Sequence, residues 1–128
     1  MRNGRDEAVE KYTNRSRSLI LQAQEELDKG DSPQASEKAW GAAAQAVKAI
    51  AELRGWEHRT HAHLFRNLTL ISTEIGEPGL LALFREASSL HQNFYEDAQT
   101  VESVQGGIDH VSRLIDKLLP LAPSSPAR

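Results

Sequence analysis

The pattern of polar and apolar positions is most distinctive between Trp40 and Leu53, where the sequence reads WGAAAQAVKAIAEL. The few positions here that are not apolar recur at steps of four, four, three and four residues, and they are Glu37, Gly41, Gln45, Lys48 and Glu52. On an α-helix this spacing draws one narrow stripe, and nearly every other position is apolar. Because such a helix is enclosed by its neighbours, we predict a central helix over about residues 33–54, with the rest of the chain packed around it.

Similar periodicity predicts four further helices. Apolar residues recur at steps of three or four within about residues 5–29, 61–75, 78–97 and 101–118. No stretch alternates in the way of a β-strand, and no heptad run is present. The sequence therefore predicts an all-α fold, a bundle of four to five helices.

Residues at the expected helix ends are typical of caps and stops. Asp31, Thr60 and Thr100 are expected to cap the helices that follow them. Gly30 and Gly55 are expected to end the first two helices. A glycine pair at 106–107 interrupts the last apolar pattern and predicts either a kink or a close contact.

These boundaries divide the chain into three parts. Residues 1–4 are expected to form a flexible N-terminus, and residues 5–119 the helical bundle domain. Residues 120–128, which read PLAPSSPAR, are rich in proline and serine and are expected to be a disordered tail.

Composition narrows the class of protein. A chain of 128 residues, 39% hydrophobic and 26% charged, is about one soluble domain. The absence of cysteine excludes disulfides, thiolate metal sites and cysteine nucleophiles. No apolar run approaches the roughly 20 residues of a membrane span, and no secretory signal is visible, so we expect a cytoplasmic location without membrane contact. The net charge of −3 excludes a generally basic domain, so binding of nucleic acid would need a local basic patch.

Cationic residues are concentrated in one segment, residues 54–66, which reads RGWEHRTHAHLFR. Its basic and titratable side chains, opposed by the single acid Glu57, are Arg54, His58, Arg59, His61, His63 and Arg66. At the start of a helix, where free N–H groups favour anions, this segment is suited to phosphate or RNA. We expect Arg59, His63 and Arg66 to bind a ligand; the alternative is a solvated connector.

The histidines of this segment do not have the spacing typical of metal ligands on a helix. His61 and His63 are two residues apart, so they diverge on a helix, and no pair is spaced at i and i+4. His61 is in line with Leu64 and Leu68, which predicts a half-buried structural histidine. We therefore expect no metal and no cofactor.

A second group of polar residues lies in residues 85–97, which read REASSLHQNFYED. Arg85 and His91 are a pair that can cleave RNA without a metal, because a histidine can move the proton and an arginine can stabilise the phosphorane-like charge. Six residues on a continuous helix leave them about 120° apart. The alternative is that His91 lies in the core, bonded to a neighbour such as Tyr95, while Arg85 lies on a solvated face.

Three stretches, KGDSPQASEKAWGAAAQAVKAIAELRGW, THAHLF and SLHQNFYE, closely resemble the PaREP family of small prokaryotic proteins. That family resembles a branch of the HEPN (higher eukaryotes and prokaryotes nucleotide-binding) superfamily. The resemblance covers about residues 16–118 and implies an up-and-down bundle of four or five helices that is often dimeric.

The resemblance also bears on the site. HEPN ribonucleases carry an R-x4–6-H motif near the dimer cleft, and Arg85 and His91 satisfy it with five residues between them. Glu86 stands where the active motif usually has a small polar residue, commonly asparagine. Asn93, Tyr95 and Glu96 match the last family stretch and are included among the expected ligand-binding residues.

Together these features predict a non-catalytic HEPN-like module that forms a homodimer and binds a nucleotide, RNA or a protein partner. The first alternative is a metal-independent endoribonuclease that uses Arg85 and His91, acting as a toxin whose partner protein is encoded by a neighbouring gene. The second alternative is a purely structural dimerisation domain.

Overall fold

The computed structural model describes residues 3–123. This part of the chain has five α-helices and one short 3-10 helix, without a strand. They are α1 (Gly4–Asp28), α2 (Ser32–Arg54), α3 (His61–Ile75), α4 (Gly79–Glu96), α5 (Val101–Leu118) and η1 (Leu119–Leu121). The predicted all-α bundle is thus confirmed.

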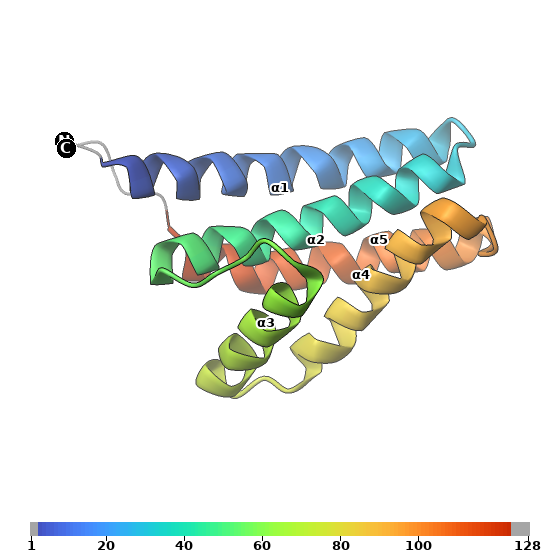
Figure 1. Ribbon diagram of the computed structural model, residues 1–128. Helices are drawn as coiled ribbons and strands as arrows, with labels where there is room; N and C mark the ends of the chain where they lie inside the picture. The colour runs from blue at the N-terminus through green and yellow to red at the C-terminus, as the bar shows by residue number, and fades with distance from the viewer. Residues whose placement is uncertain (1–2, 124–128) are drawn as a thin grey trace.

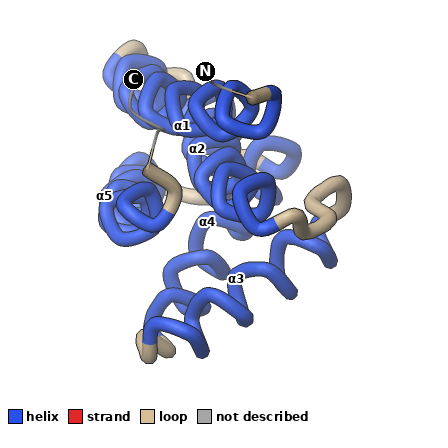
Figure 2. The backbone as a smooth tube through the Cα atoms, turned by 90° about the vertical axis from the view of Figure 1, so that its left-hand side faces the viewer, coloured by secondary structure: helices blue, strands red, loops and turns tan. Residues whose placement is uncertain are grey.

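The helices fall into two groups. In Figure 1, α1, α2 and α5 run lengthwise beside one another, whereas α3 and α4 form an antiparallel pair inclined to them. Figure 2 looks nearly along the first group, and α3 is seen there from the side. The candidate site is a groove lined by α1, α2, the connector to α3 and the start of α3.

The centre of the fold is α2, as predicted. It contacts each of the other four helices, and twelve of its residues are buried, whereas each other helix has five to seven. Small residues let α1 approach closely, since a Cβ atom at Gly41 would lie only 3.2 Å from Leu19 Cδ1. Dispersion contacts along this interface therefore involve main chain as well as side chains.

The expected cap residues and Gly55 fix helix ends, and Gly76 ends α3 in the same way as Gly55 ends α2. The side chains of Asp31, Thr60 and Thr100 each accept a hydrogen bond from the backbone N–H three residues later. Gly55 and Gly76 close α2 and α3 with φ angles of 74° and 69°, a left-handed conformation that glycine adopts without steric cost.

The described helices extend into both predicted terminal segments. Residues 120–122 belong to the packed fold, because Leu119–Leu121 form η1 and the side chains of Leu119 and Ala122 are buried. At the other end, Asn3 caps α1 by accepting a hydrogen bond from Asp6 N–H, and Gly4 is the first residue of α1. The remaining predicted terminal residues, 1–2 and 124–128, lie outside the described residues. None of the described helices has the length and apolar character needed to span a bilayer.

The glycine pair in α5 marks a close contact. A Cβ atom at Gly107 would lie 2.7 Å from Leu90 Cδ2 and 3.0 Å from Leu90 Cγ, whereas at Gly106 it would meet nothing within 4 Å. Gly107 is buried in a regular helix, so the contact sets the approach of α4 to α5. Of the two alternatives, a kink or a close contact, the structure supports a close contact between Gly107 and Leu90.

This difference makes the two glycines a matched pair for a stability test. We expect Gly107→Ala to lower the free energy of unfolding by about 1–3 kcal/mol, because the new methyl group overpacks Leu90. Gly106→Ala should instead raise it by about 0.5–1 kcal/mol through helix propensity. Urea unfolding followed by circular dichroism measures both, and equal stabilisation of the two variants would contradict the close contact.

Candidate functional site

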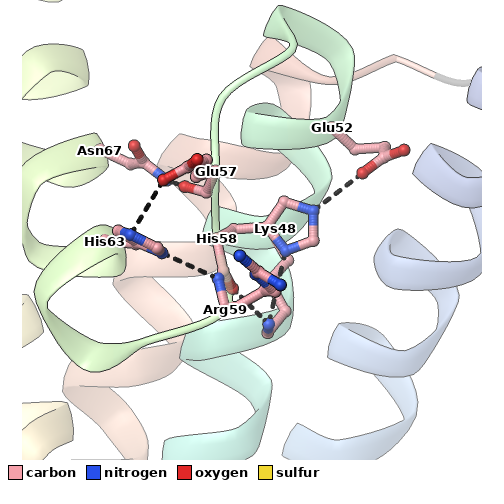
Figure 3. A network of polar contacts seen from close by, with 7 residues as sticks. All are labelled: Lys48, Glu52, Glu57, His58, Arg59, His63 and Asn67. Atoms are coloured by element: carbon pink, nitrogen blue, oxygen red, sulfur yellow. Dashed lines mark hydrogen bonds and ion pairs between the residues drawn. The ribbon is translucent and has the colours of Figure 1, made fainter.

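The connector between α2 and α3, residues 55–60, is held from both sides (Figure 3). From α2, Lys48 Nζ donates a hydrogen bond of 2.6 Å to the carbonyl oxygen of His58. Nε2 of the His58 ring lies 2.8 Å from Oε2 of Glu52, which is also on α2. Its Nδ1 lies 3.5 Å from Lys48 Nζ, and the tautomer with the proton on Nε2 would satisfy both contacts.

From α3, the connector is held by His63. Its Nδ1 accepts hydrogen bonds from the backbone N–H groups of Arg59 and Thr60, at 3.2 Å and 3.4 Å. Its Nε2 lies 3.1 Å from Glu57 Oε2, and Asn67 Nδ2 donates to the carbonyl oxygen of Glu57. His63, which we expected to bind a ligand, therefore has both ring nitrogens engaged in positioning the connector.

A groove of about 540 Å³ lies beside this connector, over the uncovered side of α2. Its lining comes from α1, α2, the connector and the start of α3: Leu19, Gln34, Glu37, Lys38, Trp40, Gly41, Ala44, Gln45, Lys48, Arg59, Thr60, His61 and Leu64. Such a volume is in the range of small-molecule and cofactor sites.

The charges around the groove are mostly positive. Lys38, Lys48 and Arg59 face the single carboxylate of Glu37. Lys38 has a weak ion pair at 3.5 Å with Glu26 of α1. Arg59 is exposed, and among residues 3–123 its guanidinium has no hydrogen-bond or ion-pair partner. Figure 3 shows Arg59 extending from the connector into the region of Lys48.

Among the titratable groups of residues 3–123, Lys48 is the one whose pKa clearly departs from its usual value. Burial removes water from its ammonium group and lowers the pKa below the usual value for lysine. An anion in the groove would supply the opposite charge that this ammonium lacks, which favours its protonated form.

An aromatic cluster, consisting of Trp40, His61, His91 and Tyr95, borders the groove. The ring centroid of His61 lies 4.9 Å from that of Trp40 and 5.0 Å from that of His91. The ring of Tyr95 lies 5.5 Å from that of His91 on the other side. His61 is exposed and not half-buried as predicted, because its ring covers Trp40 from outside.

His91 has a hydrogen-bond partner that the sequence did not indicate. Its Nδ1 lies 2.9 Å from Glu37 Oε1 of α2, and its side chain is 28% exposed. Tyr95, the expected neighbour, makes a ring contact instead. Arg85 is exposed on α4 and has no hydrogen bond, ion pair or ring contact with His91 or any other described residue. One chain therefore does not bring the two motif residues together.

The other expected ligand-binding residues are dispersed. Asn93 is only 2% exposed. Its side chain donates a hydrogen bond to Ser36 Oγ and accepts hydrogen bonds from the N–H groups of Ala98 and Gln99, so it is not available to a ligand. Arg66 is exposed on α3 outside the groove lining.

Glu96 and Tyr95 are exposed at the end of α4, where Glu96 accepts a hydrogen bond from Gln92. In residues 3–123 no group of three histidine, aspartate or glutamate side chains is placed to hold a metal ion.

Sequence reasoning missed the contribution of α2 to the groove. The stripe Glu37, Gly41, Gln45 and Lys48, which first identified the central helix, lines the groove along its length. A helix that is enclosed nearly all round has only one open side, so its polar stripe was the signal that could have located the site.

The fold and the groove thus define a small all-α bundle with a cationic hollow over its central helix. The chain belongs to the archaeal PaREP1/PaREP8 family, whose pattern it matches over residues 11–115. A crystal structure of a protein from Sulfolobus solfataricus has the same fold, with a TM-score of 0.76 and 23% identity, covering 85% of this chain and 97% of that one. No curated protein sequence matches the chain.

Proposed function

We propose that this protein is a non-catalytic binding module whose groove takes the phosphate groups of a nucleotide or RNA. The observation that carries the proposal is Arg59, an unpaired guanidinium at the edge of the groove. Its two charged or titratable neighbours on the connector, Glu57 and His58, are both paired, and its own backbone N–H is bound by His63. A side chain held this way at its base, with a free cationic end, is suited to binding an anion.

The electrostatics of the groove support the same ligand. The chain as a whole has a net charge of −3, so the attraction for an anion is local to Lys38, Lys48 and Arg59. Arginine is suited to phosphate because its planar fork can donate two parallel hydrogen bonds. A nucleotide also fits the lining, since Trp40 and His61 give the groove an aromatic side.

Arg59→Ala tests the proposal directly. We expect about a tenfold loss of affinity for uridine monophosphate, because a hydrogen bond to a charged group contributes about 1.5–3 kcal/mol. The loss should shrink at high salt, where phosphate contacts are screened. Isothermal titration calorimetry at low salt measures it. Arg113→Ala, which removes an exposed arginine from α5, is the matched control and should leave the affinity unchanged.

Two other outcomes would favour the alternatives. Cleavage of generic RNA in EDTA, lost in both Arg85→Ala and His91→Ala, would contradict a non-catalytic module and favour the ribonuclease, with the two residues meeting across a dimer. Absence of binding to uridine monophosphate and to RNA would favour a structural dimerisation domain. Three further statements stay predictions: the HEPN relationship, the homodimer and a partner encoded by a neighbouring gene. Analytical ultracentrifugation tests the homodimer.

A further inference from the structure

The aromatic cluster leads from the groove to an exposed tyrosine. His61 lines the groove, its ring contacts that of His91, and His91 contacts Tyr95 at the C-terminal end of α4. Tyr95 is 72% exposed, the largest exposure among the exposed large hydrophobic side chains in the described part of the chain. Two ring contacts, His61 with His91 and His91 with Tyr95, therefore connect the lining of the groove to the exposed ring of Tyr95.

The ring of Tyr95 has no stacked partner. Its contacts with His91 and Phe94 are close to perpendicular, with interplanar angles of 84° and 75°, and no other described aromatic ring packs against it. An aromatic face next to a positive groove is the combination that single-stranded nucleic acids use, because every base can stack whatever its sequence.

The charges near Tyr95 indicate which part of such a ligand would face it. Glu96 and Asp97 are exposed beside it, at a helix C-terminus whose dipole is also negative. These groups repel phosphate, whereas Arg59 and Lys48 attract it at the groove. A base, which is uncharged and flat, is therefore the part that suits Tyr95.

We infer that the ligand is a single-stranded nucleic acid longer than one nucleotide, with its phosphates in the groove and a base stacked on Tyr95. The inference rests on the proposed function of the groove. It makes Tyr95 the residue that distinguishes an oligonucleotide from a mononucleotide, and it gives this expected ligand-binding residue a defined role.

The test compares an oligouridylate of about ten nucleotides with uridine monophosphate, by fluorescence anisotropy and by competition at low salt. We expect the wild-type protein to bind the oligonucleotide more tightly than the mononucleotide. Tyr95→Ala should weaken oligonucleotide binding about tenfold and leave mononucleotide binding unchanged. Tyr95→Phe keeps the ring and should behave as the wild type, and Leu70→Ala removes another exposed apolar side chain as a control.

Each result bears on a different proposal. Equal affinity for both probes, with no effect of Tyr95→Ala, overturns this inference; a loss of mononucleotide binding in Arg59→Ala would then still support the groove. Duplex RNA that binds as tightly as the single strand also overturns it, because paired bases cannot stack on Tyr95. Absence of binding by any probe overturns both proposals. If an oligothymidylate shows the same loss in Tyr95→Ala, stacking without a 2′-hydroxyl contact is supported; a loss confined to RNA supports stacking together with that contact.

Discussion

Ala43→Leu and Ala46→Leu should each lower the free energy of unfolding by about 1–3 kcal/mol, because a larger side chain overpacks a well-filled core. Both alanines are 0% exposed on α2. The surrounding helices contact α2 on several sides, so a leucine has no direction in which to expand without moving a neighbour. The added apolar area cannot offset this cost where no cavity is available to receive it.

Urea unfolding of the two variants measures the effect, with Ala62→Leu and Ala82→Leu as controls. These make the same substitution at exposed positions of α3 and α4, and they should change stability by less than about 0.5 kcal/mol. If both α2 variants are as stable as the parent protein, α2 is not the centre of the core, whatever the controls show.

Asn93→Ala should be comparably destabilising, at about 3 kcal/mol, because it leaves buried hydrogen-bonding groups without partners. Asn93 Nδ2 donates to Ser36 Oγ at 2.8 Å, and Ser36 is fully buried on α2. Asn93 Oδ1 accepts from the N–H groups of Ala98 and Gln99, each at 2.8 Å, which shapes the turn from α4 into α5. One side chain thus joins three segments of the fold.

The matched control is Gln92→Ala, which removes an exposed amide from the neighbouring position and should be nearly neutral. Adding Ser36→Ala to Asn93→Ala should recover part of the loss, since the hydroxyl left unpaired is then removed. Thermal unfolding of the single and double variants forms the cycle. If Asn93→Ala hardly changes the free energy of unfolding, water must replace the lost hydrogen bonds, which would contradict this prediction.

Local signals predicted most of the fold. Residues 61–75 were expected to form a helix, and α3 has these bounds because Thr60 caps it and Gly76 ends it, both through interactions within a few residues. The end of the chain shows where local signals fail. Proline and serine favour disorder after residue 119, but Ala122 lies in the hydrophobic core together with residues from distant segments.

The site shows the same division. The concentration of cations in residues 54–66 pointed to Arg59. It did not show that His63 would hold the connector, because this depends on the backbone path that presents two N–H groups to one ring nitrogen. The pairing of His91 with Glu37 joins residues 54 positions apart, and no periodicity within one helix could indicate it.

The stripe on α2 has a consequence for how this family can diversify. Gln45 and Lys48 line the groove without being buried, whereas Trp40 and Ala44 line it and also belong to the buried core. If the groove binds a ligand as proposed, Gln45 and Lys48 can change without a change in the buried core, whereas Trp40 and Ala44 serve both the groove and the core. Under the proposed function, ligand preference could be altered through these two stripe positions on a scaffold whose core is left intact.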